Sequence, residues 1–386
     1  MTGDQIVSSL LAMTGNMRTL LTPYNDEKTT YPGIFKRTIH TMKAKHIIPC
    51  CYHPTTPLLL DDEQAYLDSL VARLDNIPQP YEYNTPAKAL QFITKNYQSS
   101  IDSTAWSSNL QLERPDLDEA DLDEHEHALI EIDISSIYKQ VFNPLRFKEL
   151  AVILSDYEMP GLNGLEFFKK IEDKPFQKLL LTGHASHTLG INAFNDGIIE
   201  RFVDKSTSDD TSEFTTRINA VFRELEKRYF QKLSINTFQN LSKNKRSALG
   251  EPFFFDLFHQ LVEKNHIIEY YLVSDTGCFL MLNEMGQKSW LIAKSEEDMR
   301  YFYNTAVDNE APETIIELLK KREHVLFLFS EQDENEVPCD DWERYLHPAE
   351  RKVGEKNTFY CAYSHSQPVY DQQLETIFSY RDFLTG

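Results

Sequence analysis

The sequence predicts an α/β domain with a parallel sheet, followed by a separate α+β domain with an antiparallel meander. From residue 58 to about 232, short apolar segments alternate with helical periodicity, and each apolar segment ends in polar residues. Buried parallel strands have this pattern because helices cover both faces of their sheet. Beyond residue 265, apolar segments follow one another across short polar links, which is typical of hairpins.

The elements of the first domain can be placed in order. Apolar strands are expected at 58–60, 151–154, 178–181 and 198–203, with a weaker strand at 81–83. Helical spacing of apolar residues begins near Leu67, and residues 86–97 and 164–171 are also predicted to be helical. A long amphipathic helix is expected from 211, running on to Leu241.

Domain boundaries are expected near residues 57 and 232. Residues 1–57 are predicted to hold one helix, Ile6 to Leu20, and a proline-rich linker. The first domain covers 58–232 and is interrupted by an insertion near 98–147, which has three Lys and Arg against eleven Asp and Glu. Such a segment is typical of a solvated loop, and a docking surface for a basic partner is the alternative.

The second domain, 233–386, is predicted to alternate between helices and hairpins. Helices are expected at 253–264, at 314–321, near 374–383, and after a capping box that begins at Ser295. Strands are expected at 267–273, 278–282, 290–293, 325–329 and 358–363. This domain carries a net charge of −11 and has no helix-turn-helix and no signature of a cyclic-dinucleotide synthase or hydrolase, so it matches no output domain that we recognise.

Composition limits the classes of function. The chain has 386 residues, 39 Lys and Arg against 60 Asp and Glu, and a net charge of −21, which disfavours nucleic acid as a partner. No apolar segment approaches the roughly 20 residues that cross a bilayer. The N-terminus lacks a secretory signal, and five scattered cysteines suit no disulfide framework, so we expect a cytoplasmic protein that does not enter membranes. Cys50, Cys51 and His53 lack a second ligand pair at zinc spacing.

Polar residues follow four of the predicted strands. Asp61 and Asp62, Asp156, Thr182 and Lys205 each come at or just after a strand's carboxyl end, where the ligand site of a parallel sheet lies. Three converging carboxylates repel one another unless a cation is present, and an all-oxygen set of this kind suits Mg²⁺. A carboxylate beside a metal ion can attack a phosphoryl group, whose oxygens an ammonium and a hydroxyl would then stabilise.

At these positions the sequence resembles the receiver domain of two-component response regulators. The matching segments are LLLDDEQ (58–64), ILSDYEMPGLNG (153–164), LLLTGHAS (179–186) and FVDKS (202–206). The resemblance covers 58–232 apart from the insertion, and it implies a flavodoxin-like sheet of five parallel strands. It also implies that Asp156 is the phosphoacceptor. Asp61 and Asp62 would bind Mg²⁺ together with Asp156 and the backbone carbonyl of Glu158.

The resemblance assigns the remaining site residues to a switch. Thr182 is the hydroxyl that turns toward the phosphoryl group, Lys205 is the lysine that pairs with it, and Phe202 is the aromatic ring that moves with it. Ser206 departs from the family, which usually has a proline after the lysine.

The function expected from these residues is that of a response regulator. A sensor histidine kinase or a phosphotransfer protein would phosphorylate Asp156, and the phosphoryl group would switch an atypical output domain that acts through protein contacts. A homodimer is the family expectation, and the downstream protein is unknown. Two alternatives stay open for the second domain, an enzyme acting on nucleotides or nucleic acid and an atypical DNA-binding regulator.

Overall fold

A computed structural model describes residues 47–74, 77–96, 107–109, 130–183, 187–205, 211–328, 337–355, 357–365 and 377–386. The predicted helix Ile6–Leu20 and the most acidic part of the insertion lie outside these ranges. None of the helices within them is both long and apolar enough to span a membrane.

The first domain is built on a sheet of five parallel strands, as predicted. Its strand order is β3-β2-β6-β7-β8, the order of flavodoxin-like folds. The bounds of the strands are Leu58–Leu60 (β2), Tyr81–Tyr83 (β3), Val152–Asp156 (β6), Gln177–Thr182 (β7) and Arg201–Asp204 (β8). The central strands β2, β6 and β7 are buried along their whole length, which explains their continuous apolar segments at 58–60, 152–154 and 179–181.

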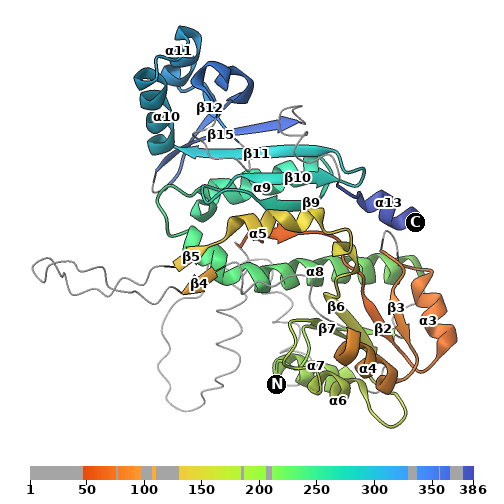
Figure 1. Cartoon of the computed structure of the whole chain (residues 1–386). Coiled ribbons are helices and arrows are strands. Elements are labelled where there is room, and N and C mark those ends of the chain that lie inside the picture. Colours follow the sequence, from red (N-terminus) through yellow and green to blue (C-terminus); the bar gives the residue numbers. More distant parts are fainter. Residues whose placement is uncertain are drawn as a thin grey trace, which may run out of the picture. The chain divides into compact units, whose positions relative to one another are not determined.

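Helices cover both faces of this sheet (Figure 1). Successive residues of a strand point to opposite faces, so Leu58 and Leu60 enter one core while Leu59 enters another. The helices α3 (Gln64–Val71) and α8 (Thr211–Leu241) contribute residues to the core that contains Leu59. The helices α4 (Pro86–Asn96), α6 (Gly164–Lys169) and α7 (His187–Asn195) contribute residues to the core that contains Leu58.

The second sheet has six antiparallel strands in the order β1-β9-β10-β11-β15-β14 (Figure 1). They span Cys51–Tyr52 (β1), Ile267–Leu272 (β9), Phe279–Asn283 (β10), Lys288–Ser295 (β11), Glu350–Val353 (β14) and Thr358–His365 (β15). The antiparallel meander β9-β10-β11 confirms the predicted α+β arrangement. The prediction of a linker up to residue 57 missed β1, where Cys51 pairs with Tyr271 and Tyr52 with Tyr270. A strand of two residues between prolines carries too little periodicity to be recognised.

Smaller elements surround the second sheet. The capping box at Ser295 opens α10 as predicted, because Ser295 and Asp298 each accept a hydrogen bond from the other's backbone N–H. The predicted strand 325–329 is shorter, and the last helix begins later than expected. The helices are α5 (Ile134–Tyr138), α9 (Pro252–Lys264), α10 (Glu296–Asp308), α11 (Glu313–Lys321) and α13 (Tyr380–Thr385), and the strands are β4 (Ser107–Asn109), β5 (Ile130–Ile132), β12 (His324–Leu326) and β13 (Leu346–Pro348).

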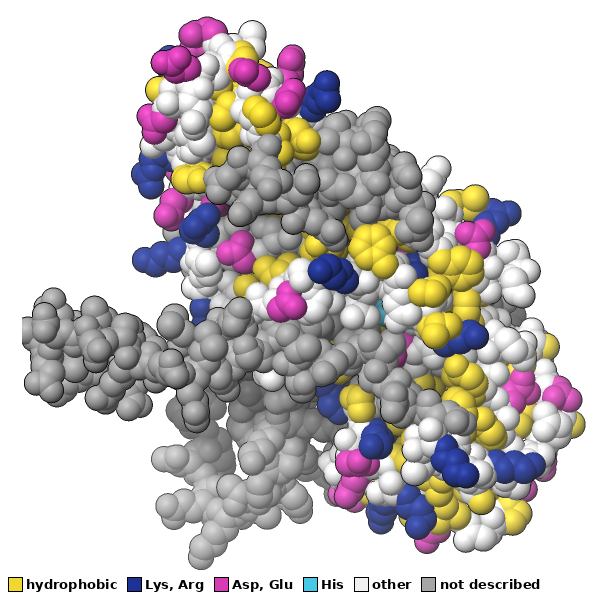
Figure 2. All heavy atoms as spheres, viewed as in Figure 1, with side chains coloured by type: hydrophobic (Ala, Val, Ile, Leu, Met, Phe, Trp, Pro, Cys, Tyr) yellow, Lys and Arg dark blue, Asp and Glu magenta, His cyan; other side chains and the backbone are white. Residues whose placement is uncertain are grey.

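Charged side chains are mixed on the face shown in Figure 2. Lys and Arg side chains lie among Asp and Glu side chains over the parallel-sheet region, and the described residues form no continuous basic surface on this face.

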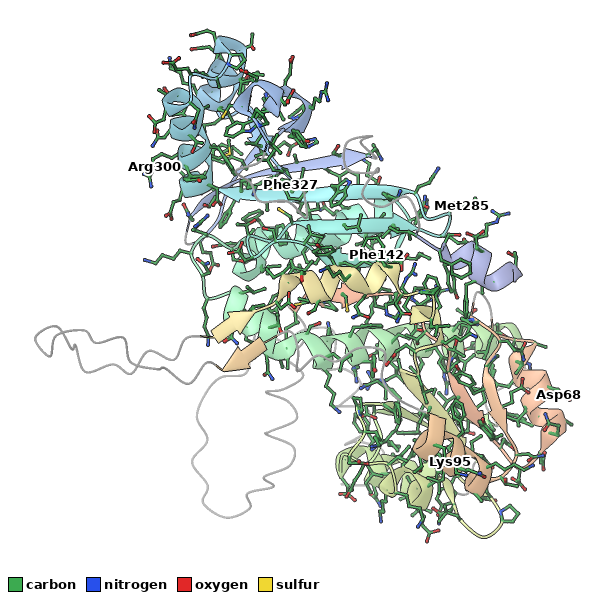
Figure 3. The ribbon with its side chains drawn as sticks, in the orientation of Figure 1. Asp68, Lys95, Phe142, Met285, Arg300 and Phe327 are labelled. Carbon is green, nitrogen blue, oxygen red and sulfur yellow. The ribbon has the colours of Figure 1, made fainter. Side chains whose placement is uncertain are left out.

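A buried ion pair connects the end of the insertion with the second sheet. Arg146 Nε lies 2.6 Å from Glu269 Oε2, and both side chains are almost completely buried. Phe142, four residues before Arg146, packs against the hydrophobic core that also contains Leu59 (Figure 3). The predicted loop therefore has an ordered C-terminal part, and its Arg146 is part of the packing around β9.

Candidate functional site

The register of the parallel strands places four of the predicted site residues at one edge. Leu60 pairs with Ser155, so Asp61 follows β2 at the level of Asp156. Thr182 is the last residue of β7, and Lys205 follows β8 directly. The carboxyl ends of adjacent parallel strands meet at the same edge of the sheet, so local strand ends suffice to gather these distant residues.

Lys205 binds two of the carboxylates. Its Nζ lies 2.7 Å from Asp61 Oδ2 and 2.9 Å from Asp156 Oδ1. The Asp61 and Asp156 side chains are buried, whereas the Lys205 side chain is partly exposed. The other Asp61 oxygen, Oδ1, accepts a hydrogen bond from the backbone N–H of Glu63 at 3.0 Å. Both carboxylate oxygens of Asp61 are therefore fixed, one by Lys205 and the other by the Glu63 N–H.

Three carboxylates form the cluster that the sequence predicted. One oxygen each of Asp61, Asp62 and Asp156 lies within 4.8 Å of the others, and Asp62 is exposed where the other two are buried. Hard carboxylate oxygens at this spacing, with one side open to solvent, fit Mg²⁺, which keeps several waters. These three side chains are thus suited to hold the ion. Among the described residues, no other group of three or more His, Cys, Asp and Glu side chains has metal-ligand spacing.

The protonation equilibria at this site are shifted by burial and by charge. Burial raises the pKa of Asp156, and the Asp61 carboxylate adds to the rise, while Lys205 and the Tyr157 N–H oppose it. Burial alone would lower the pKa of Lys205, but Asp61 and Asp156 outweigh it, so the pKa of Lys205 is raised. Lys205 therefore stays cationic, while Asp156 is a carboxylate that is stabilised less than a surface carboxylate would be.

Thr182 supplies a hydroxyl with unused hydrogen-bonding capacity. Its side chain is buried, and Oγ1 has no hydrogen-bond partner among the described residues. Buried hydroxyls are normally paired, so an orphaned one needs an explanation. Phe202 is close by, since a Cβ built on Gly190 would meet Phe202 Cγ at 3.2 Å and Thr182 Cγ2 at 3.4 Å. The predicted hydroxyl and aromatic ring therefore flank one point on α7.

Gly164 is a residue of the matching motif whose role only the structure explains. Its N–H donates to the Tyr157 carbonyl at 3.0 Å. A Cβ at this position would lie 2.2 Å from the backbone oxygen of Asp156. The start of α6 thus packs directly on the backbone of the candidate phosphoacceptor, and only glycine allows this approach.

Tyr66 is a site residue that the sequence did not reveal. Lys205 Nζ lies 4.3 Å from the centre of the Tyr66 ring, on the first turn of α3. A cation over an aromatic face is stabilised by the ring quadrupole. One tyrosine in an ordinary amphipathic helix gives no signal for this contact.

The remaining predictions have mixed outcomes. Glu158 is exposed, and its proposed use of a backbone carbonyl stays a prediction. Ser206 lies outside the described residues. Cys50, Cys51 and His53 are completely buried, and stacking or edge contacts to Phe147, Phe230 and Tyr271 place the His53 ring in the aromatic core. Their burial among these rings favours a structural role over zinc binding.

Comparison with known proteins agrees with this geometry. No protein-family model matches the chain. The solved structure of the Legionella pneumophila response regulator LqsR is 30% identical, covers 88% of this chain and 95% of its own, and has a TM-score of 0.66. The transcriptional regulatory protein FixJ of Bradyrhizobium diazoefficiens is 36% identical over 76 residues, which are 19% of this chain. The chain spans 36% of the length of FixJ, the curated relative that it matches.

A five-stranded parallel sheet that ends in this acidic cluster defines a receiver domain of the two-component type. The similarity to LqsR extends well beyond that domain, because it covers nearly the whole of both chains. The chain belongs to the response regulators.

Proposed function

We propose that Asp156 accepts a phosphoryl group and that this modification controls the second domain. The observation that carries the proposal is the convergence of Lys205 on Asp61 and Asp156, beside Asp62, at one edge of the sheet. The family membership supports the same assignment. The donor is a phosphohistidine of a sensor histidine kinase or of a phosphotransfer protein.

The chemical step is a transfer between two nucleophiles. An Asp156 carboxylate oxygen attacks phosphorus, the P–N bond of phosphohistidine breaks, and the released imidazole nitrogen keeps the bonding electron pair. The raised pKa of Asp156 fits a carboxylate whose charge is poorly stabilised before it reacts. Lys205 lies 2.9 Å from Asp156 Oδ1, where its positive charge can stabilise the oxygens of the transferred group.

Asp61, Asp62 and Asp156 would hold Mg²⁺ together with the backbone carbonyl of Glu158. Bound there, the ion neutralises negative charge between the carboxylates and the phosphoryl oxygens. The residues of the chain do the rest of the positioning. Lys205 fixes Asp61 and Asp156, and the Glu63 N–H orients the second oxygen of Asp61.

Thr182 would carry the signal away from Asp156. Its unpartnered hydroxyl can donate to a phosphoryl oxygen, and this would favour a shift of the Thr182 side chain toward the site. Phe202 would then occupy the space that Thr182 leaves beside Gly190. The switch ends on the surface of α7, β8 and α8, and through α8 it reaches the second domain.

The second domain would act through protein contacts. It is net acidic, and the face in Figure 2 shows no continuous basic surface among the described residues, which favours a protein target over nucleic acid. Homodimer formation and a cytoplasmic location complete the proposal, as expected for a regulator that meets its kinase in the cytoplasm.

Phosphorylation can be tested by mass measurement on the whole chain. The protein is incubated with acetyl phosphate and Mg²⁺, and the intact mass is compared with that of Asp156→Asn and Asp68→Asn. Asp68 is an exposed residue of α3 (Figure 3) and serves as the matched control. We expect one phosphate adduct in the wild type and in Asp68→Asn, and none in Asp156→Asn. An adduct that persists in Asp156→Asn contradicts the assignment.

The output can be tested by affinity capture with and without the phosphodonor. A partner protein that is retained only by the phosphorylated wild type, and not by Asp156→Asn, supports control by phosphorylation. Equal retention in both states contradicts that control.

A further inference from the structure

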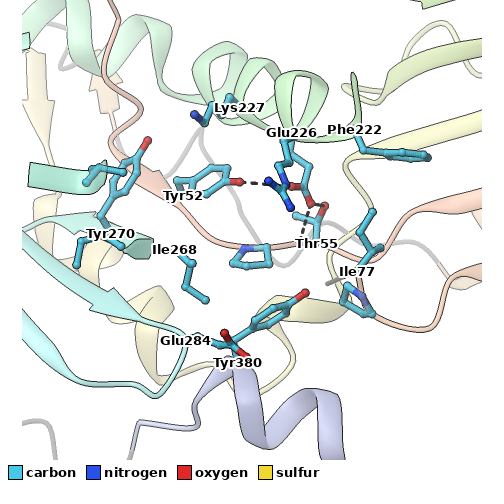
Figure 4. A pocket seen from close by; sticks show the side chains of 15 residues that line it. Tyr52, Thr55, Ile77, Phe222, Glu226, Lys227, Ile268, Tyr270, Glu284 and Tyr380 are labelled. Atoms are coloured by element: carbon cyan, nitrogen blue, oxygen red, sulfur yellow. Dashed lines mark hydrogen bonds between the residues drawn. The ribbon is translucent and has the colours of Figure 1, made fainter. Parts of the chain in front are cut away.

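A cavity of about 330 Å³ lies away from the acidic site, where α8, β1, β9 and α13 meet. Figure 4 shows it from close by. This volume is at the lower end of the range for small-molecule pockets. The walls are mostly apolar and include Tyr52, Phe222, Tyr270 and Tyr380. The Tyr52 and Tyr270 rings stack with their centroids 5.5 Å apart, which gives one wall a flat aromatic surface.

Glu226 places a carboxylate on the α8 side of the cavity, and this carboxylate is already hydrogen-bonded to the chain. Its Oε1 accepts hydrogen bonds from the Thr55 N–H at 2.9 Å and the Thr55 hydroxyl at 2.6 Å. Its Oε2 accepts from the Tyr52 hydroxyl at 3.4 Å. These contacts, drawn in Figure 4, tie α8 to the segment around β1. The carboxylate of Glu226 therefore has little capacity left for a ligand.

Arg223 and Lys227 lie on the same part of α8 and also line the cavity. Both are exposed, and neither forms an ion pair with any residue that the structure describes. Other arginines near this helix do pair, since Arg201 and Arg228 each bind Glu224, at 2.6 and 2.7 Å. Arg223 and Lys227 therefore place two positive charges at the α8 end of the cavity, and the charge of Arg223 also acts on the neighbouring Glu226 carboxylate.

We propose that this cavity binds a small organic anion with an aromatic or apolar body. The anionic head would lie between Arg223 and Lys227, and the body would contact the stacked tyrosines. Glu284 lies at the other end of the cavity, beside Tyr380 (Figure 4). Its carboxylate repels an anionic head at that end, whereas the α8 end has two positive charges, on Arg223 and Lys227, against the single carboxylate of Glu226. A guanidinium binds a carboxylate with two parallel hydrogen bonds, which makes Arg223 the main anchor.

The position of the cavity gives such a ligand a regulatory role. It would contact α8, which packs on the parallel sheet, and both β9 and α13 of the second domain. A ligand there stabilises the arrangement in which these elements are joined, by mass action. This input does not require phosphorylation, since none of the cavity residues belongs to the acidic site.

Three ligands that share a phenylpropyl skeleton and differ in the charge of the head group test whether the cavity prefers an anion. The unphosphorylated protein is titrated calorimetrically at neutral pH with 3-phenylpropionate, 3-phenylpropanol and 3-phenylpropylamine. We expect the carboxylate to bind most tightly and the amine most weakly. In Arg223→Gln the carboxylate should lose on the order of tenfold in affinity while the alcohol is unaffected, as expected when one charge-assisted contact is removed. Lys227→Gln should show a smaller loss.

Arg217→Gln is the matched control, because Arg217 is exposed on the same helix and does not line the cavity. Circular dichroism shows whether each variant is folded, and the ranking of head groups in the wild type needs no variant at all. Binding that persists in Asp156→Asn supports a site independent of phosphorylation. Tightest binding of the amine overturns the proposal. So does the absence of binding by any probe at millimolar concentration, or an equal affinity in Arg223→Gln and Arg217→Gln.

Discussion

The Lys205 ammonium lies 2.7 Å from Asp61 Oδ2, although 144 residues of sequence separate the two. The contact joins the end of the last strand of the parallel sheet to the end of the strand that comes first in the chain. Because Lys205 also reaches Asp156, one cation is shared by two buried carboxylates. Lys205 therefore both supports the acidic cluster and competes with any other cation for it.

This competition gives opposite predictions for two charge-removing substitutions. Asp62→Asn should weaken Mg²⁺ binding by about tenfold or more, which corresponds to about 1.4 kcal/mol, because one carboxylate of the cluster is lost. Lys205→Met should leave Mg²⁺ binding equal or tighter, because a positive charge is removed from beside Asp61 and Asp156. Calorimetric titration with Mg²⁺ measures both. Weaker binding in Lys205→Met would show that Lys205 orients the carboxylates more than it repels the ion.

Gly164→Ala should disturb the site without changing a charged group. The new Cβ would lie 2.2 Å from the Asp156 backbone oxygen, so the start of α6 or the end of β6 must move. We expect a loss of about 1–3 kcal/mol in the free energy of unfolding, the usual range for overpacking. Phosphorylation from acetyl phosphate should also slow.

Urea denaturation measures the effect of Gly164→Ala on stability. Gly183→Ala is the matched control, because a Cβ there meets no atom within 4 Å and Gly183 has no left-handed φ. An equal loss in both variants would mean that crowding at Asp156 is not the cause.

The sequence predicted the parallel sheet and its acidic edge because each depends on local signals. A strand such as 58–60 is apolar along its length, and Asp61 comes where that strand must end. Parallel pairing then brings such ends together without any information about distant contacts. The structural role of Gly164 could not be predicted in this way, because it depends on a contact that is not local. The backbone oxygen of Asp156, at the end of β6, approaches Gly164 only in the folded chain and leaves no room for a side chain there.

Other contacts between distant segments could not be predicted from the sequence either, because they depend on tertiary packing and leave no local pattern. The two residues of β1 have too little pattern to indicate a strand, and they become one only by pairing with β9. Arg146 lies in the insertion that was predicted to be a solvated loop, and no local pattern indicates that it pairs with the buried Glu269. Lys205 was placed correctly at a strand end, but its contact with the Tyr66 ring depends on how α3 packs.

Glu226→Gln should change how stability depends on pH. Burial raises the pKa of Glu226 to about 7, from its ordinary value of 4.5, against the hydrogen bonds from Thr55 and Tyr52 and the charge of Arg223. A carboxyl with a raised pKa in the folded state contributes stability that is complete below pH 4.5 and is lost as the pH rises through about 7. The glutamine variant cannot ionise, so it should become more stable relative to the wild type across this window.

Urea midpoints measured at pH 4.5 and above pH 7 check this expectation. Glu213→Gln is the control, since Glu213 is exposed in the first turn of the same helix. A difference between Glu226→Gln and wild type that stays constant with pH would argue against the titration of Glu226 in this range.

The buried pair of Arg146 and Glu269 should be among the most sensitive contacts in the chain. Arg146 donates to both Glu269 oxygens, at 2.6 and 3.0 Å, and to the Phe378 carbonyl at 2.7 Å, while the Tyr271 hydroxyl donates to Glu269 at 2.8 Å. Removing one partner leaves the other charge buried and unpaired. Glu269→Ala or Arg146→Ala should therefore cost about 3–5 kcal/mol in the free energy of unfolding.

A double substitution separates the pair from its surroundings. Arg146→Met with Glu269→Leu leaves no unpaired charge and should recover most of the stability lost in either single variant. The surface pair Lys352–Glu350, 2.7 Å apart, is the control, and breaking it should cost at most about 1 kcal/mol. Urea denaturation followed by circular dichroism measures all of these variants.

Because Arg146 holds the segment leading into β6 against β9, its loss should also separate unfolding of the two sheets into distinct transitions. A single transition in Arg146→Ala would instead show that α8 and the shared core around it are sufficient to keep the sheets cooperative.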